Sequence, residues 1–208
     1  KNFLTVIRLI LERNPLFQMV DGVRLGRTVT LEDLFLAGFD HISLCTGAGK
    51  PSTLSPPYHS PDIRMGVHFL MNLHLTPFEE VKIHKNLFRL PAYVYGAGLT
   101  AIDTATELLA AYEKYVVKIA SLRKENSPVL SKIPTADLET FLSHAHALKK
   151  APSPVHKKEL LAQWGGVTLL YRKELENAPS YRISRHEVAN ALSEGVHIQE
   201  KIHLPGSD

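Results

Sequence analysis

The stretch "VYGAGLTAIDTATE", from Val94 to Glu107, decides the fold expected for this chain. A short apolar run meets two glycines, and a helical pattern follows at once. The spacing fits G-x-G-x-x-A, in which the first glycine makes a tight turn, the second lets a pyrophosphate approach the backbone, and the third small residue lets helix and strand pack. The helix N-terminus then presents N–H groups and a positive dipole to phosphate. The sequence therefore predicts a dinucleotide-binding turn, with a purely structural strand-to-helix connection as the alternative. The predicted cofactor-binding residues of the turn are Gly96, Ala97, Gly98, Leu99, Thr100 and Ala101.

Elements on both sides of this turn follow the order of a parallel α/β unit. Apolar and β-branched runs predict strands at 92–95, 167–171 and 196–198, and a helix opens at Leu99. A second helix, in "SRHEVANALSEGV", ends at Gly195. Strand, helix, strand, helix, strand is typical of a parallel sheet. We therefore expect an α/β fold with a Rossmann-like parallel sheet, flanking helices and a long helical insertion.

The insertion is predicted at about 111–163. The helix from Leu99 runs to about Lys124, longer than a helix that only crosses a sheet needs to be, and its apolar residues repeat at 3,4,3,4,3. A second helix is expected from Thr135 to Lys149, and Ser153 before Pro154 starts a third. We expect a hairpin that projects from the domain and either packs only on itself or docks a protein partner or another part of a parent chain. The apolar seam consists of Ile102, Ala105, Leu109, Tyr112, Val116 and Ile119.

The N-terminal part predicts a different arrangement. Residues 1–13 have helical spacing, and 17–50 read as strand, turn, short helix and strand. Thr30 is expected to cap the short helix, and Cys45 is expected to lie buried in a strand at 39–45. Residues 51–62 contain four prolines and read as a connection, followed by a short helix in "GVHFLMNLHL". We therefore divide the chain into 1–60 and 61–208.

Composition narrows the classes of function. A net charge of +3 is too mild to indicate nucleic acid. No apolar stretch approaches the roughly 20 residues of a membrane span. One cysteine permits no internal disulfide, so we expect a reducing, cytoplasmic compartment. His144 and His146 are two residues apart on a helix and face different ways, so no metal site is expected.

The second predicted strand indicates which nucleotide the turn would hold. No acidic residue follows the turn at the spacing typical of NAD sites. With the insertion set aside, the next strand ends in Tyr171-Arg172-Lys173. Basic residues at this position favour a 2′-phosphate, hence NADP. A solvated basic pair at a strand end is the alternative. Asp103, one turn into the helix, is expected near the pyrophosphate face.

Three segments together resemble one family: "LEDLFLAGFDHISLCTGAGKP", "VYGAGLTAIDTATE" and "GGVTLLYRKELENAPSYRISRHEVANALSEGV". They are similar to the glutamate synthase small-subunit type of FAD-dependent, NADPH-oxidising oxidoreductase, which has two nested dinucleotide domains. The resemblance covers about three quarters of the chain, outside the insertion. It implies that Thr46 and Gly47 touch the flavin and that the glycine turn holds the NADPH pyrophosphate. It also implies that Arg172 and Lys173 meet the 2′-phosphate, with Arg182 assisting. The last segment carries the most specific match, at Pro179, Glu187, Ala191, Glu194 and Gly195.

Two departures from the family qualify this interpretation. Leu99 stands where most members have asparagine. The chain also lacks the family's earlier glycine-rich turn for FAD and its iron–sulfur cysteines. The resemblance therefore implies a piece of a larger enzyme, which passes hydride from NADPH to FAD, and the isolated chain is expected to be inactive. It implies NADPH and the rest of a FAD domain as partners, and no catalytic residue within this chain. The alternative is a degenerate Rossmann scaffold whose helical insertion docks a partner.

Overall fold

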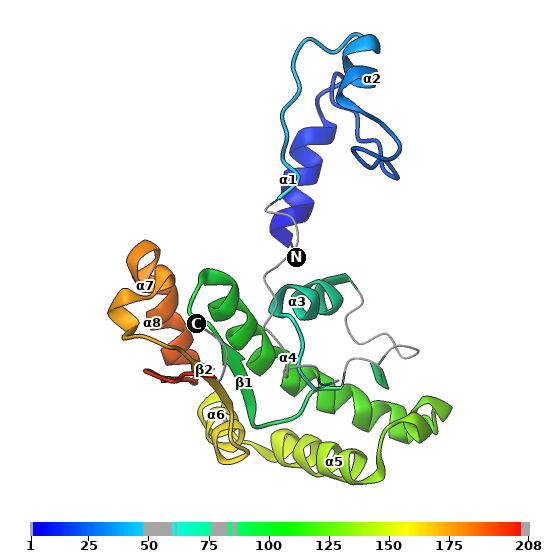
Figure 1. Ribbon diagram of the computed structural model, residues 1–208. Coiled ribbons are helices and arrows are strands. Elements are labelled where there is room, and N and C mark those ends of the chain that lie inside the picture. The colour runs from blue at the N-terminus through cyan, green and yellow to red at the C-terminus, as the bar shows by residue number, and fades with distance from the viewer. Residues whose placement is uncertain (1, 48–59, 61, 76–82, 85–86, 205–208) are drawn as a thin grey trace. The chain divides into compact units, whose positions relative to one another are not determined.

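The computed structural model describes residues 2–47, 60, 62–75, 83–84 and 87–204 (Figure 1). The chain divides into two compact units, Lys1–Lys50 and Pro51–Asp208, and each is described by itself. The division falls beside the proline-rich connection at 51–62, most of which lies outside the described residues. No helix in the described part of the chain combines the length and the apolarity needed to cross a bilayer.

The first unit contains two helices, α1 (Asn2–Glu12) and α2 (Leu31–Leu36), both at predicted places. Thr30 caps α2 as expected: its Oγ accepts a hydrogen bond from the N–H of Asp33 at 3.1 Å. The Asp33 carboxylate accepts one in return from the Thr30 N–H at 2.8 Å. This reciprocal pair is a capping box, which satisfies two backbone donors that the helix start would otherwise leave open.

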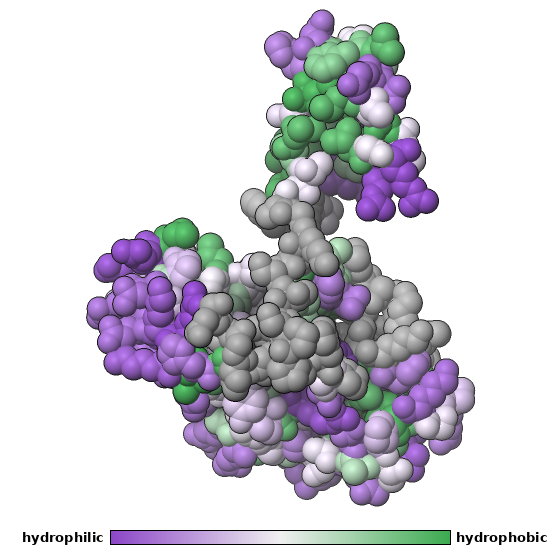
Figure 2. All heavy atoms as spheres, viewed as in Figure 1, coloured by the Kyte–Doolittle hydropathy of each residue, from purple (hydrophilic) through white to green (hydrophobic). Residues whose placement is uncertain are grey.

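The strands predicted within 17–50 are wrong where the structure describes them. Residues 39–47 form no strand, and within the described part of 17–47 the only pairing is a single bridge between Leu25 and Val29. Cys45, predicted to be buried in a strand, is exposed. None of residues 5–47 is buried, and many large apolar side chains there face outward (Figure 2). Strand propensity alone does not form a strand, because a strand needs a partner and an apolar face to cover.

The second unit is built on a small parallel sheet. Its strands are β1 (Ala92–Tyr95), β2 (Val167–Leu170) and β3 (Val196–Gln199), in the spatial order β1-β2-β3. The register sets Tyr95 opposite Leu170, and Leu170 opposite Gln199. The carboxyl ends of all three strands therefore meet at one edge. This confirms a mixed α/β fold with a parallel sheet flanked by helices.

The helix α4 (Leu99–Lys124) links the sheet to the predicted helical insertion. Its first half packs on all three strands, and α3 (Gly66–Leu75) lies against it. Farther along, α5 (Thr135–Lys150) runs back beside α4, after a 3-10 turn at Pro128–Lys132 (Figure 1). Then α6 (Pro154–Gln163) begins at the predicted Ser153 cap and leads into β2. The structure confirms the hairpin, and all six residues of the predicted apolar seam are buried.

The hairpin shares one apolar core with the sheet. Phe141 of α5 is almost fully buried, with its ring edge-on to Tyr115 of α4 at a centroid distance of 5.3 Å. Tyr112 of α4 lies 6.3 Å from the same ring. Core residues from Ile102 to Leu148 join those of the strands in a single cluster. Because these side chains pack together, the hairpin is a continuous extension of the sheet unit.

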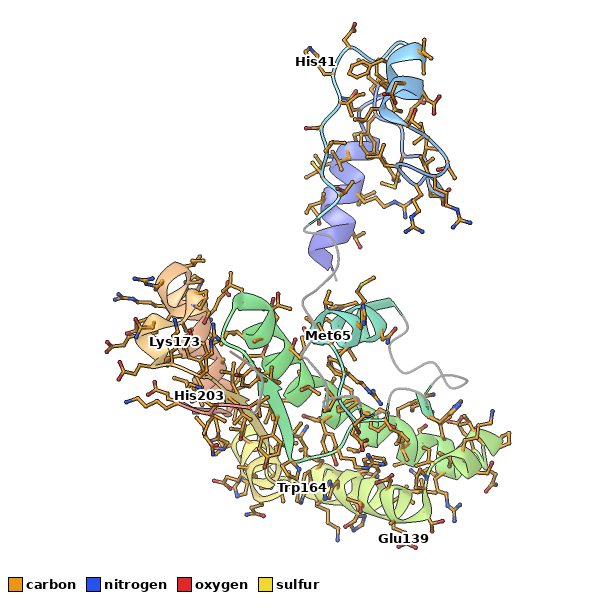
Figure 3. All side chains as sticks on the ribbon, in the orientation of Figure 1. His41, Met65, Glu139, Trp164, Lys173 and His203 are labelled. Atoms are coloured by element: carbon orange, nitrogen blue, oxygen red, sulfur yellow. The ribbon has the colours of Figure 1, made fainter. Side chains whose placement is uncertain are left out.

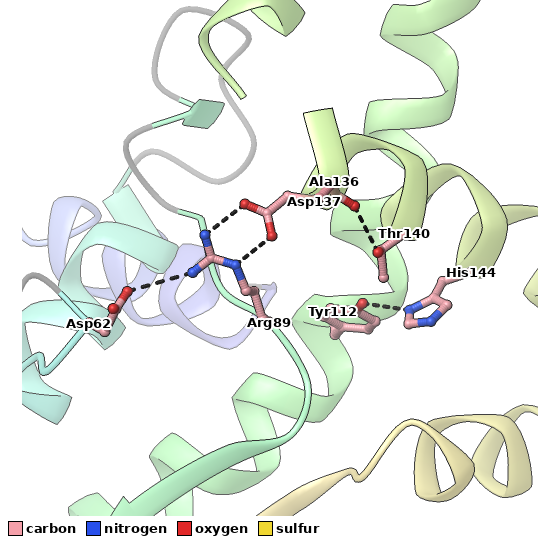
Figure 4. Close-up of polar contacts among 7 residues, drawn as sticks. All are labelled: Asp62, Arg89, Tyr112, Ala136, Asp137, Thr140 and His144. Atoms are coloured by element: carbon pink, nitrogen blue, oxygen red, sulfur yellow. Dashed lines mark hydrogen bonds and ion pairs between the residues drawn. The ribbon is translucent and has the colours of Figure 1, made fainter. Parts of the chain in front are cut away.

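Two polar contacts hold the hairpin in place, one at its surface and one within it (Figure 4). Arg89, just before β1, donates two hydrogen bonds to the Asp137 carboxylate of α5, each 2.6 Å long. This guanidinium holds the pKa of Asp137 below its usual range. Within the hairpin, the Tyr112 hydroxyl lies 2.7 Å from Nδ1 of His144, whose ring stacks on Trp164 at 3.6 Å. Burial lowers the pKa of His144.

The chain between β2 and β3 contains elements that the sequence did not predict. A 3-10 turn spans Leu175–Asn177, and a short helix, α7, spans Pro179–Ile183. Then α8 (Arg185–Glu194) follows as predicted and packs on α4 and β3. It ends at Gly195, whose φ of +105° lies in the left-handed region that favours glycine.

Candidate functional site

The glycine turn lies at the carboxyl edge of the sheet, directly after β1. The N–H of Gly96 donates to the carbonyl of Leu170 at 2.9 Å, which joins the turn to the end of β2. Gly96 has a φ of +120°, so only glycine takes this conformation without strain. A Cβ added there would lie 3.8 Å from the Cβ of Ala101, so the two small residues of the G-x-G-x-x-A pattern face each other across the turn.

Gly98 has no comparable conformational reason to be glycine. Its φ of −82° and ψ of 170° are extended backbone open to most residues. Among the described residues, nothing lies within 4 Å of a Cβ added at this position. Gly98 is the N-cap of α4 and offers no side chain to its first turn, so the N–H groups that follow have no such acceptor. This combination leaves room and hydrogen-bond donors for an anion.

The remaining residues of the turn divide between the core and the surface. Ala97 is buried, and Leu99 is half-buried where most of the resembled family has asparagine. Thr100 is exposed at the start of α4, and its carbonyl accepts a hydrogen bond from the Thr104 hydroxyl at 2.6 Å. The exposed backbone at Thr100 lies on the same first helical turn as Gly98.

The predicted basic pair lies at the same edge of the sheet as the turn. Arg172 and Lys173 follow β2 directly, two and three residues after Leu170, and both are exposed. Their backbone is held in place: the Lys173 carbonyl accepts from the N–H of Lys201 at 3.4 Å. Figure 3 shows Lys173 among the side chains beside α7 and α8. The structure therefore brings the basic pair and the glycine turn to one edge of the sheet.

A third segment, α7, contacts the turn directly. Ser180 is completely buried, and both its N–H and its hydroxyl donate to the carbonyl of Ala97, at 3.2 Å and 2.8 Å. Sequence reasoning missed this contact, since the two residues are 83 positions apart. The predicted Arg182 belongs to the same short helix and is exposed. Next to it, the Arg185 guanidinium lies 4.9 Å from the centre of the Tyr181 ring.

Acidic groups lie behind the turn, along α4. Asp103 is exposed, yet partial burial, together with Glu187 of α8 and Glu107, raises its pKa. His74 of α3 acts in the opposite direction and lowers it. Asp103 was expected near the pyrophosphate face, and its negative charge would repel an anion there rather than hold it.

The predicted flavin contacts belong to the first unit. Thr46 and Gly47 end its described segment, where both are exposed, and Gly47 has a φ of +77°. The remaining residues of that loop, 48–50, lie outside the described residues. The flavin role of Thr46 and Gly47 therefore stays a prediction.

A separate hollow lies beneath α3. It has a volume of about 320 Å³, and its lining includes Met65, Phe69, Phe88 and Tyr115. None of the predicted nucleotide residues lines it. Its walls are mostly aromatic and aliphatic side chains, with Arg64, His68 and Asn72 as the polar members, and none of the glycines that phosphate recognition uses lines it. We therefore place the candidate nucleotide site at the glycine turn.

Comparison with known proteins adds one relative. No family model matches the chain, and no solved structure is significantly similar to it. "Uncharacterized protein RP006" from Rickettsia prowazekii (strain Madrid E) is 35% identical over 204 residues. The alignment covers 97% of this chain and 29% of that protein. The chain thus spans less than a third of the length of this curated relative.

Proposed function

We propose that this chain is the NADPH-binding portion of a flavin-dependent oxidoreductase similar to the glutamate synthase small subunit. The observation that carries the proposal is Gly98. Neither backbone conformation nor crowding requires glycine at this helix start, whereas the approach of a pyrophosphate does.

The second support is the grouping of three distant segments around that turn. The glycine turn, the basic pair after β2 and the helix α7 meet at the carboxyl edge of a parallel sheet. Ligands of open α/β sheets bind at this edge. The N–H groups at the start of α4 would hold the pyrophosphate, while Arg172 and Lys173 would meet the 2′-phosphate.

In this proposal the chain's own task is to bind and orient the nucleotide. The nicotinamide supplies hydride when NADPH is bound, and the protein sets its position and excludes competing reactions. No side chain needs to act as an acid or a base. Thr46 and Gly47 alone offer too few contacts to hold FAD, so a flavin site would need further parts of a longer protein. We expect such a protein to work in the cytoplasm.

The exposed apolar residues of the first unit are compatible with this assignment. Val6, Ile10 and Leu11 of α1, together with Phe35 and Leu36 around α2, are exposed within their own unit. An apolar surface of this extent usually marks a contact with another protein part. In the proposed enzyme, the remainder of the flavin domain would cover it.

The alternative is a scaffold domain that has lost nucleotide binding and docks a partner through its hairpin. Leu99 favours it, because this residue departs from the resembled family. A lost site would be expected to fill with side chains, yet the space beside Gly98 is open with respect to the described residues. We therefore favour the nucleotide-binding function.

Calorimetric titration of the chain with NADPH and with NADH at low salt tests the proposal. We expect tighter binding of NADPH, and a double change of Arg172 and Lys173 to alanine should weaken NADPH binding about tenfold or more while leaving NADH unchanged. A double change of Lys149 and Lys150 to alanine removes the same charge from the end of α5 and serves as the control. Equal binding of both nucleotides would remove the 2′-phosphate assignment, and no binding of either would contradict the proposal.

A further inference from the structure

We propose that Ser180 is a positioning residue for the glycine turn, and that it sets which way a backbone N–H of the proposed pyrophosphate site points. This inference rests on the proposed function, because it concerns the same site. Ser180 touches no nucleotide in this account. It acts through the peptide bond that joins Ala97 to Gly98.

Two groups of Ser180 donate hydrogen bonds to one acceptor, the carbonyl oxygen of Ala97. The N–H of Ser180 lies 3.2 Å from the Ala97 oxygen, and its hydroxyl oxygen lies 2.8 Å from it. Ser180 has no exposed surface, and Ala97 is nearly as buried. A carbonyl oxygen has two lone pairs, so the two donors satisfy it fully. Water does not compete for this acceptor in a buried setting, which makes the orientation costly to change.

The orientation of this carbonyl fixes the next N–H. In a trans peptide, the C=O of Ala97 and the N–H of Gly98 point in opposite directions. Because Ser180 holds the carbonyl toward α7, the Gly98 N–H faces away from α7. A rotated peptide would turn the carbonyl oxygen outward, where its negative end would repel a phosphate. Ser180 therefore disfavours the unproductive orientation of the turn.

The geometry also explains why a helix as short as α7 starts where it does. Pro179 begins α7 and has no N–H to satisfy, so the first donor of the helix is that of Ser180. That donor and the adjacent hydroxyl both point at the turn. Ala178, before Pro179, is fully buried as well, which fixes the entry of the chain into α7. The placement of α7 and the orientation of the turn are thus coupled.

Changing Ser180 to alanine removes one of the two donors and leaves the backbone N–H in place. We expect NADPH affinity to fall about fivefold, the effect of one ordinary hydrogen bond. Binding of adenosine 2′-monophosphate should stay unchanged, because this fragment has the 2′-phosphate but no pyrophosphate. Changing Ser184 to alanine is the matched control: Ser184 is also buried in this region, and its hydroxyl lies 3.2 Å from Nδ1 of His186, away from the turn.

Calorimetry on the 208-residue chain supplies the affinities, and amide NMR supplies a local measurement. Addition of NADPH should shift the Gly98 amide resonance in the unmodified chain and in Ser184→Ala, and shift it less at saturation in Ser180→Ala. An unmodified chain that binds no nucleotide would refute the proposed function itself. If the chain binds NADPH and Ser180→Ala binds it equally well, with the same Gly98 shift, only the role of Ser180 is refuted. Equal weakening by Ser184→Ala, or parallel loss of adenosine 2′-monophosphate binding, would show a general structural effect and would also overturn it.

Discussion

Replacing Gly98 with alanine separates the role of this residue in the fold from its role at a phosphate site. The backbone angles, φ −82° and ψ 170°, suit alanine, and the added methyl would meet no described atom within 4 Å. Alanine is a poorer N-cap than glycine, so we expect the free energy of unfolding to fall by about 0.5–1 kcal/mol. A pyrophosphate packed against this backbone would collide with the methyl group. NADPH affinity should therefore fall at least about tenfold, which is about 1.4 kcal/mol.

Replacing Gly96 with alanine provides the contrast. Its φ of +120° is unfavourable for any residue with a Cβ, so this change should cost about 1–3 kcal/mol of stability as well as binding. Urea unfolding gives the stabilities, and calorimetry gives the affinities. If Gly98→Ala keeps full NADPH affinity, the turn does not hold the pyrophosphate. If Gly98→Ala is as unstable as Gly96→Ala, the open space beside Gly98 is not present in solution.

Three further changes test the packing and the electrostatics of the second unit. Phe141→Ala should lower the free energy of unfolding by about 3–5 kcal/mol, because the buried ring of Phe141 packs on Tyr115. Urea unfolding of this variant should still show one cooperative transition. A loss below about 1 kcal/mol, or two separate transitions, would contradict a core shared by the hairpin and the sheet. Burial lowers the pKa of His144, so the neutral form is favoured in the folded chain and stability should fall as the pH drops below about 6.5. His144→Phe keeps a ring against Trp164 and should flatten this dependence of the melting temperature on pH, whereas an unchanged slope would exclude His144 as its source. Burial and nearby carboxylates raise the pKa of Asp103, so the ionised form costs stability, and Asp103→Asn should raise the melting temperature at about pH 8 but not at about pH 3, where both side chains are neutral. A larger gain at the lower pH would show that the ionised form of Asp103 does not destabilise the folded chain.

Local signals predicted most of the second unit correctly. The strand at 92–95 and the helix from Leu99 to Lys124 have the predicted bounds, because glycine, proline and apolar spacing mark their ends. Ser153 caps α6 through its hydroxyl as expected, and Gly195 ends α8. Each of these features depends on residues within a few positions of one another, which is the range over which a sequence pattern carries information.

Contacts between residues far apart in the sequence could not be predicted from the sequence. The Ser180–Ala97 and Arg89–Asp137 pairs span 83 and 48 positions, so no local pattern shows them. Pro179 did offer a signal for α7, since proline favours the first position of a helix. The predicted strand at 39–45 failed for a related reason: its residues have strand-like composition, but pairing depends on a neighbouring strand that the local sequence does not reveal.

In the candidate site, too, local features were predicted and contacts between distant residues were not. The glycine pattern located the turn and explained Gly96, while the open space at Gly98 emerged only from the fold. The placement of Arg172 and Lys173 beside the turn follows from the register of β1 against β2. That register could be expected from a parallel α/β unit, but the contact of α7 with the turn could not.

A crystal structure of the chain soaked with NADP⁺ would test the central claim most directly, because it locates the pyrophosphate. We expect phosphate oxygens within hydrogen-bond distance of the N–H groups of Gly98, Leu99 and Thr100, with the 2′-phosphate beside Arg172 and Lys173. A nucleotide bound elsewhere, such as in the hollow beneath α3, or a turn that stays free of ligand at saturating NADP⁺, would contradict it.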